Sequence, residues 1–253
     1  MPQPLTVTRN SLEAHFKLVA EILSELVDVH AQVDVEVNWS MSPAVAALAG
    51  EGCERISRNR GRAGVLVAPL KHLGQGLWAW LSYREEWSYG REIGGRKRFI
   101  FRSASMTVHF GWKFDAYKPQ MFRAEWAGWA DWGGAELGYQ AGEAGHPHWQ
   151  FDALESLSEE GASERAAMLR KILSDGDHGG VRDFIPQLPT DDVRDLVSHQ
   201  QLSRIHFASA AAWWKASPNC DHAHSPDRVK DLQVWLRQTI SYLSSELDRL
   251  QIA

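Results

Sequence analysis

The sequence is poor in cysteine and has no long hydrophobic run. Its two cysteines, Cys53 and Cys220, lie in unlike contexts and belong to no Cys-x-x-Cys pair. This excludes a disulfide framework and predicts two unpaired, reduced thiols. Apolar runs such as Val65 to Leu70 are far shorter than the ~18–20 residues that a membrane helix requires. The first ten residues lack the apolar stretch of a secretory signal, so we expect a cytoplasmic protein without membrane contact.

The sequence also lacks the common catalytic signatures. It contains no P-loop, no Gly-x-Gly-x-x-Gly after a predicted strand, no Gly-x-Ser-x-Gly elbow, no His-Glu-x-x-His and no kinase catalytic set. The glycines between Gly90 and Gly95 are typical of a turn between strands. No complete motif therefore assigns a reaction to this chain.

A net basic charge is also absent, since the formal net charge is −5. An acidic balance argues against a general nucleic-acid binder, because such domains are usually basic overall. One segment departs from this average: Glu51 to Arg102 holds 11 Lys or Arg residues and 5 Asp or Glu residues. The chain therefore has one basic segment within acidic surroundings.

What the sequence does contain is enough apolar material for a core. Hydrophobic residues make up 44% of the 253 residues and charged residues 23%, as in ordinary folded proteins. We expect a single domain over residues 1–253, with helix and sheet in residues 1–152 and helices in residues 153–253.

Periodicity in the first part of the chain predicts a helix followed by strands. Apolar residues step by three and four over Ser11–Val29, which predicts an amphipathic helix. Ala31–Val37 alternates like a half-buried strand, and Val65–Ala68 resembles a buried strand. The Ala-rich segment Pro43–Ala49 predicts a short helix.

A Trp-rich sheet is predicted in the middle of the chain. Eight of the twelve tryptophans fall between Trp78 and Trp149, where the period changes to two. Turn residues separate the alternating runs, as in an antiparallel meander. The predicted strands are Leu77–Tyr83, Lys97–Arg102, Met106–Phe114, Met121–Trp126 and His146–Phe151.

The last third of the chain has helical spacing. Helices are predicted at Ser163–Leu173, Thr190–Lys215 and Ser225–Leu250, the last with Ser225 as N-cap and Pro226 at its first position. Its apolar stripe is typical of a surface packed on a sheet, and a coiled-coil homodimer through residues 225–250 is the alternative. The predicted fold is α+β, with an N-terminal helix, a central largely antiparallel sheet and a C-terminal helical layer.

Alternation places titratable side chains on one face of the predicted sheet. In Met106–Asp115, four apolar residues (Val108, Phe110, Trp112 and Phe114) share one face, and His109 and Lys113 share the other. In the His146 strand, His146, His148, Gln150 and Asp152 point away from the core side. Arg123 and Glu125 join this polar face if the strands are neighbours.

Two chemistries are open to this face, and a solvated polar surface is the third interpretation. His146, His148, Asp152 and His109 are candidate ligands for a divalent metal such as zinc, which activates water for hydrolysis. Without metal, His148 backed by Asp152 is a candidate general base, with Lys113 stabilising an anionic transition state.

Two further histidine groups favour structural roles. The run from Cys220 to His224 holds metal-binding side chains, but with Ser225 and Pro226 it also fits a loop and a helix cap. His206 falls in a predicted helix, where a hydrogen-bonded packing role is expected.

The basic segment suggests binding rather than catalysis. Its candidate anion-binding residues lie among aromatic residues such as Trp87 and Tyr89, a mixture that binds phosphates and stacks exposed bases. A solvated edge or a protein-docking surface is the alternative. The candidates are Arg58, Arg60, Arg62, Arg96, Lys97 and Arg98. We therefore favour a binding or regulatory component with a protein or polyanionic (nucleic-acid) partner, with the hydrolase on the His146/His148/Asp152 face as the alternative.

Overall fold

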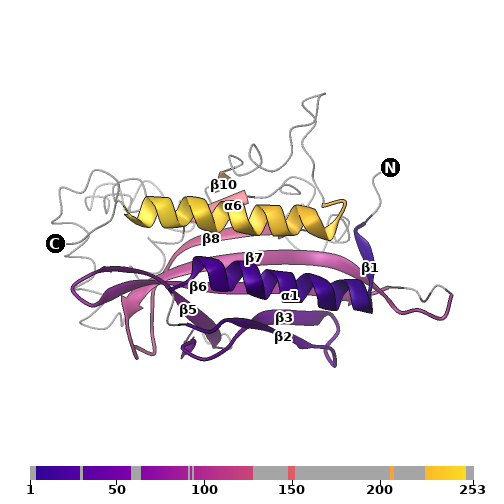
Figure 1. The fold of residues 1–253 in the computed structure, drawn as a ribbon, viewed down its shortest axis with the longest axis horizontal. Coiled ribbons are helices and arrows are strands. Elements are labelled where there is room, and N and C mark those ends of the chain that lie inside the picture. Colours follow the sequence, from indigo (N-terminus) through magenta and orange to yellow (C-terminus); the bar gives the residue numbers. More distant parts are fainter. Residues whose placement is uncertain are drawn as a thin grey trace, which may run out of the picture.

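Two helices lie on one face of a curved antiparallel sheet (Figure 1). The computed structural model describes residues 4–28, 31–57, 64–90, 92, 94–127, 148–151, 206–207 and 226–248. The helices are α1 (Arg9–Leu26) and α6 (Val229–Asp248). The strands are β1 (Thr6–Thr8), β2 (Asp34–Asn38), β3 (Ala44–Ala49), β4 (Glu54–Ile56), β5 (Val65–Gly74), β6 (Leu77–Tyr89), β7 (Arg98–Trp112), β8 (Gln120–Ala127), β9 (His148–Phe151) and β10 (His206–Phe207). This confirms the predicted α+β architecture.

The long β6–β7 hairpin forms the centre of the sheet. The main path through the described strands runs β10-β9-β8-β7-β6-β3-β2, and β1 pairs with β7 beside it. One edge of β6 has two partners in succession. It pairs with β5 over Leu77–Leu81 and with β3 over Arg84–Trp87. The two partner strands therefore diverge beside the middle of β6.

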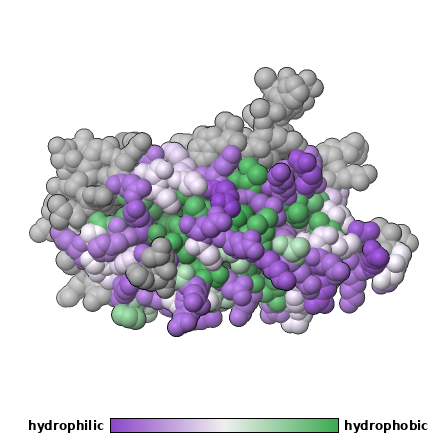
Figure 2. Space-filling view, viewed as in Figure 1, coloured by the Kyte–Doolittle hydropathy of each residue, from purple (hydrophilic) through white to green (hydrophobic). Residues whose placement is uncertain are grey.

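Both helices bury an apolar stripe against the sheet. On α1 the buried residues include Leu12, Phe16 and Val19. On α6 they are Leu232, Trp235, Leu236, Thr239, Ile240, Leu243 and Leu247. The exposed sides of these helices contribute hydrophilic surface, with hydrophobic residues visible between (Figure 2). Because the α6 stripe is buried in the chain's own core, a homodimer through this helix would have to use its other side. Among the described residues, no helix is long and apolar enough to cross a membrane.

A buried polar network joins the two helices to β6. The carboxylate oxygens of Glu85 lie 3.0 and 3.1 Å from His15 Nε2, and both residues are fully buried. Tyr83 Oη and Trp87 Nε1 also donate to this carboxylate, the indole at 2.8 Å. Gln233 Nε2 of α6 lies 3.1 Å from His15 Nδ1. Glu85 thus has several donors in place of water, as a buried carboxylate requires.

These contacts set the ionisation of the network. Burial alone raises the pKa of Glu85, but the charge of His15 and the hydrogen bonds from His15, Tyr83 and Trp87 outweigh it, so the pKa lies below its ordinary value. Burial and the neighbouring Glu85 raise the pKa of Tyr83 well above 10.0. Glu85 is therefore held as a carboxylate inside the core.

Several predicted elements need correction. Pro43–Ala49 was predicted to be helical, but Ala44–Ala49 is strand β3, because pairing on both edges and burial outweigh the high helix propensity of alanine. His206 lies in the short strand β10 and not in a helix, since Gln150 of β9 is its pairing partner. α6 begins at Val229, where the Asp231 carboxylate accepts hydrogen bonds from two preceding backbone N–H groups. The predicted helix Ser163–Leu173 and the cap Ser225 lie outside the described residues.

Candidate functional site on the helix-free face

The face of the sheet opposite the helices carries polar side chains in register. Arg84 of β6 lies opposite Ala47 of β3 on one side and Ser105 of β7 on the other. The same row continues through Glu36 of β2 at one end, and through Glu125 of β8 and His148 of β9 at the other. Residues in one row share a face, so Glu36, Arg84 and Glu125 lie together on the helix-free side.

Hydroxyl groups form the middle of this face, and two arginine–glutamate pairs flank it. Ser82 pairs in register with Thr107, and both are only 4% exposed. On β6, Arg84 Nη2 and Glu86 Oε1 are 2.6 Å apart; on β8, an Arg123 guanidinium nitrogen lies 3.1 Å from Glu125. The face is therefore a polar surface of mixed charge and not an apolar docking face.

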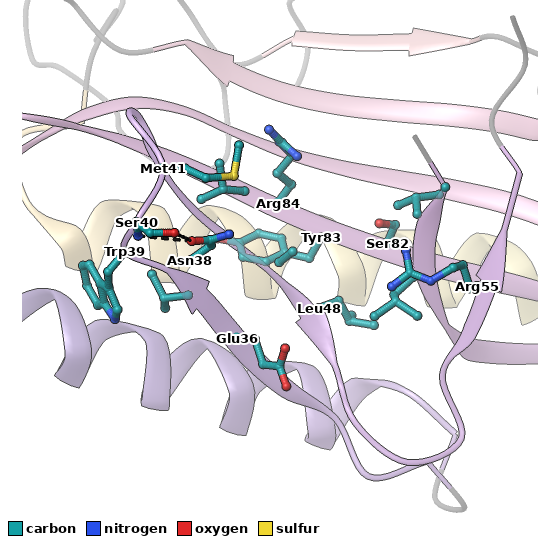
Figure 3. Close-up of a pocket in the computed structure, with 16 residues that line it drawn as sticks. Glu36, Asn38, Trp39, Ser40, Met41, Leu48, Arg55, Ser82, Tyr83 and Arg84 are labelled. Atoms are coloured by element: carbon teal, nitrogen blue, oxygen red, sulfur yellow. Dashed lines mark hydrogen bonds between the residues drawn. The ribbon is translucent and has the colours of Figure 1, made fainter. Parts of the chain in front are cut away.

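A groove opens where β6 changes partners. Among the described strands, neither β5 nor β3 pairs with Ser82 or Tyr83, and the two strands diverge there. The resulting groove has a volume of about 730 Å³. Figure 3 shows Arg55 at one end and Trp39 with Ser40 at the other, with the helices behind the sheet. Its lining residues are Glu36, Val37, Asn38, Trp39, Ser40, Met41, Val45, Ala47, Leu48, Arg55, Gly64, Val65, Leu66, Ser82, Tyr83 and Arg84.

The groove offers cations and hydrogen-bonding groups to a ligand. Arg55 is exposed and, within the part of the chain that the structure describes, makes no ion pair. Arg84 shares the groove but is bound to Glu86. An arginine guanidinium binds phosphate or carboxylate through two parallel hydrogen bonds. Of the groove residues, Arg55 is therefore the one cation without an ion pair among the described residues, and the carboxylate of Glu36 lines the same groove.

Next to the groove, a buried lysine organises the turn between β7 and β8. Lys118 is 1% exposed, and its Nζ donates to Glu54 Oε2 at 2.8 Å and to the carbonyl oxygens of Trp112 and Asp115 at 2.6 and 2.9 Å. The same Nζ lies 4.4 Å from the ring centroid of Trp80. The ammonium group thus has three acceptors and an aromatic face in place of water. This cage ties the turn to β4.

The turn presents an aromatic side chain to solvent. Phe114 is 91% exposed and has φ of 65°. Its backbone N–H is 3.1 Å from each carboxylate oxygen of Glu54. The alternation of Met106–Phe114 predicted that Phe114 would share the core face. That prediction was wrong, because β7 ends at Trp112 and the chain turns away there.

The predicted metal ligands are only partly described. His146 and Asp152 lie outside the described residues. His148 lies opposite Glu125 in the sheet, whereas His109 lies in β7, two strands away and four positions along, roughly 16 Å by standard strand spacings. His109 is buried, with Nδ1 3.0 Å from the Lys118 carbonyl and Nε2 2.9 Å from Thr107 Oγ1. The structure therefore does not bring His109 to His148.

The predicted catalytic lysine lies at another place. Lys113 follows the end of β7, and its Nζ is 4.7 Å from the ring centroid of Trp78. It is about eight positions along the sheet from the row that contains His148, roughly 26 Å. Among the described residues, no group of three or more His, Cys, Asp or Glu side chains could hold a metal ion.

The predicted anion-binding residues fall into two separate groups. Arg58, Arg60 and Arg62 lie outside the described residues, in the connection that joins β4 to β5. Arg96, Lys97 and Arg98 lie at the far end of the β6–β7 hairpin, where Arg98 pairs with Thr8 of β1. The aromatic residues predicted near them, such as Trp87, are mostly core residues. Of the six predicted residues, the structure therefore places only Arg96, Lys97 and Arg98.

Sequence reasoning missed the groove and the exposed aromatic residue. Arg84 and Glu36 had no signal beyond ordinary strand alternation, because only the pairing with Ala47 brings them to one row. Phe114 had a usable signal, since the segment Lys113–Pro119 contains the charged and proline residues of a turn.

Comparisons with known proteins identify no similar protein. The chain matches no protein-family model, no curated protein and no solved structure.

Proposed function

We propose that this protein is a binding component whose groove on the helix-free face takes a phosphate-bearing polyanion. One observation carries the proposal: Arg55 lines a groove of about 730 Å³ and, among the described residues, has no carboxylate partner. Ser82, Asn38 and Ser40 supply further hydrogen-bonding groups along the same groove. An unpaired guanidinium in a concave polar site favours an anion with several oxygen acceptors.

The sequence around Arg55 supports a ligand with more than one charge. Arg58, Arg60 and Arg62 follow Arg55 within seven positions, and Gly64, just after them, lines the groove. Each phosphate that these arginines neutralise would release bound counterions, which is the main source of affinity for nucleic acids. The acidic remainder of the chain would confine this affinity to one place.

Arg55→Ala is expected to weaken the binding of a fluorescein-labelled ten-nucleotide oligothymidylate and to flatten its salt dependence. Loss of one phosphate contact reduces the slope of log K against log salt by about 0.7 for a single strand. Fluorescence anisotropy at four salt concentrations measures both effects.

The matched control is Arg237→Ala, an exposed arginine on the opposite face that pairs with Glu25. It should leave affinity and slope unchanged. The proposal fails if Arg55→Ala binds like the wild type. It also fails if Arg96→Ala, at the hairpin end, abolishes binding while Arg55→Ala does not.

One observation favours a second candidate, a hydrolase. The β8–β9 register pairs the backbone of His148 with that of Glu125. An imidazole next to a carboxylate is a common general base or metal-ligand pair.

For the hydrolase we expect bound zinc in protein purified without a histidine tag, and loss of both zinc and bis(p-nitrophenyl) phosphate hydrolysis in His148→Ala. Gln150→Ala, two positions along the same strand, is the matched control and should keep both. Elemental analysis and a colorimetric assay measure the two properties. Metal-free protein whose activity is unaffected by His148→Ala would eliminate this candidate.

A further inference from the structure

The β7–β8 turn holds a solvent-exposed phenyl ring in a conformation that phenylalanine rarely adopts. Phe114 has φ of 65° and is 91% exposed. A bulky side chain is disfavoured in this left-handed region, and an exposed ring gains nothing from burial in the protein's core. Phe114 therefore lowers stability both through its backbone conformation and through its exposed side chain, which is typical of residues retained for a function.

The surrounding contacts keep the ring in place. Both carboxylate oxygens of Glu54 accept from the Phe114 N–H at 3.1 Å, and the buried Lys118 ammonium fixes that carboxylate from the other side at 2.8 Å. The Ser57 N–H donates to the Ala116 carbonyl at 2.7 Å. The ring is thus presented from a fixed backbone, so little conformational entropy is lost when a ligand packs on it.

This turn and the groove meet at one strand. Glu54, which holds Phe114, immediately precedes Arg55, which lines the groove, and successive Cα atoms are about 3.8 Å apart. Neighbouring strand residues point to opposite sides, so β4 serves the turn with one residue and the groove with the next.

From this arrangement we infer that the polyanion is a single-stranded nucleic acid and that Phe114 stacks on one of its bases. Arg55 and the exposed ring lie on the two sides of β4, which pairs only with β5 among the described strands, so a single strand that passes around this edge would reach both. An arginine together with an exposed aromatic ring is a combination that binds single strands without sequence preference. Inorganic polyphosphate would bind Arg55 but has no flat surface on which the phenyl ring could stack. In a duplex the bases are stacked on each other, so none has a free face on which Phe114 could stack. The inference rests on the proposed function of the groove.

The experiment compares Phe114 variants on two polyanions. The probes are the ten-nucleotide oligothymidylate, its oligouridylate equivalent and long-chain inorganic polyphosphate as a competitor. Phe114→Ala should weaken oligonucleotide binding roughly 5- to 100-fold, the usual effect of losing one stacked base. Phe114→Trp should keep the wild-type affinity, and Phe114→Leu, which has no ring, should bind as weakly as Phe114→Ala. Competition by polyphosphate should be unchanged in all three variants, whereas Arg55→Ala should weaken both ligands.

A glycine variant separates function from folding. Phe114→Gly relieves the left-handed strain, so its thermal midpoint should equal or exceed that of the wild type while its oligonucleotide affinity falls as in Phe114→Ala. Equal affinity of the two probes would assign the ligand to single strands in general, and a preference for uridylate would assign it to RNA.

The outcomes distinguish the inference from the proposal on which it rests. Unchanged oligonucleotide affinity in Phe114→Ala, together with weakened binding in Arg55→Ala, would overturn the stacking role and leave the polyanion groove intact. No binding of either polyanion would overturn both. Phe114-dependent binding to phosphatidylserine vesicles without binding to oligonucleotide would reassign the ring to a lipid surface and overturn the inference.

Discussion

Glu85→Gln is expected to lower the free energy of unfolding by about 3 kcal/mol, because it breaks a fully buried carboxylate–imidazole pair. The amide cannot accept from His15, Tyr83 and Trp87 together, so buried donors lose their partner. Urea denaturation at neutral pH measures the change.

The next residue on the same strand provides the control. Glu86 pairs with Arg84 on the partly exposed face, and Glu86→Gln should change stability by no more than about 1 kcal/mol. Equal losses in the two variants would contradict the role assigned to the buried network.

The same pair predicts a dependence of stability on pH. The pKa of Glu85 is lower in the folded protein than its ordinary value of 4.5, so the carboxylate favours folding above that value. This contribution is lost as the pH falls from above 4.5 through the lower folded-state pKa. The stability difference between wild type and Glu85→Gln should therefore shrink over this acid range. A difference that stays constant would show that the ionised form has no special role.

Lys118→Met is expected to have the second largest effect on stability, a loss of about 3 kcal/mol, since it leaves a partly buried carboxylate and two carbonyl groups without their donor. The turn should loosen as a result, because Glu54 then holds the Phe114 N–H without a fixing charge. Urea denaturation and chymotrypsin cleavage after Phe114 measure the two effects.

Lys113→Met is the matched control on the same turn. The Lys113 side chain is exposed, and its one contact within the described part of the chain is a cation–π contact with Trp78, so its loss should lower stability by less than about 1 kcal/mol. Cleavage after Phe114 should be faster in Lys118→Met only. Similar cleavage rates in both variants would refute the role of the Lys118 ammonium group in fixing the turn.

Close packing around Lys118 also explains the glycine at position 111, because a Cβ there would lie 2.7 Å from Lys118 Cγ.

Signals of the buried network were present in the sequence but were hidden by a stronger pattern. Glu85 falls between Tyr83 and Trp87 on the apolar phase of β6, and His15 falls beside Phe16 on the apolar stripe of α1. A charge at a core position predicts a partner. The identity of that partner could not be predicted, because 70 residues separate His15 from Glu85.

On the polar face, too, the sequence predicted which residues share a side of one strand but not how far apart the strands lie. Alternation correctly put Arg123 and Glu125 on one face of their strand, since a strand has a period of two whatever its neighbours. The distances between these groups depend on strand order and register. These set His148 opposite Glu125 and leave His109 two strands away.

Periodicity by itself determined the fold class, the amphipathic helix α1, the long helix α6 and the strand phases, because each follows from spacing of three to four or of two along a continuous segment. Only the tertiary structure decided that Ala44–Ala49 is a strand, that β6 changes partners at Ser82 and that Phe114 leaves the core face. The partners of Ala44–Ala49 in the sheet and the Glu54 carboxylate that binds Lys118 are distant in the chain from the residues they contact. Local patterns do not contain that information.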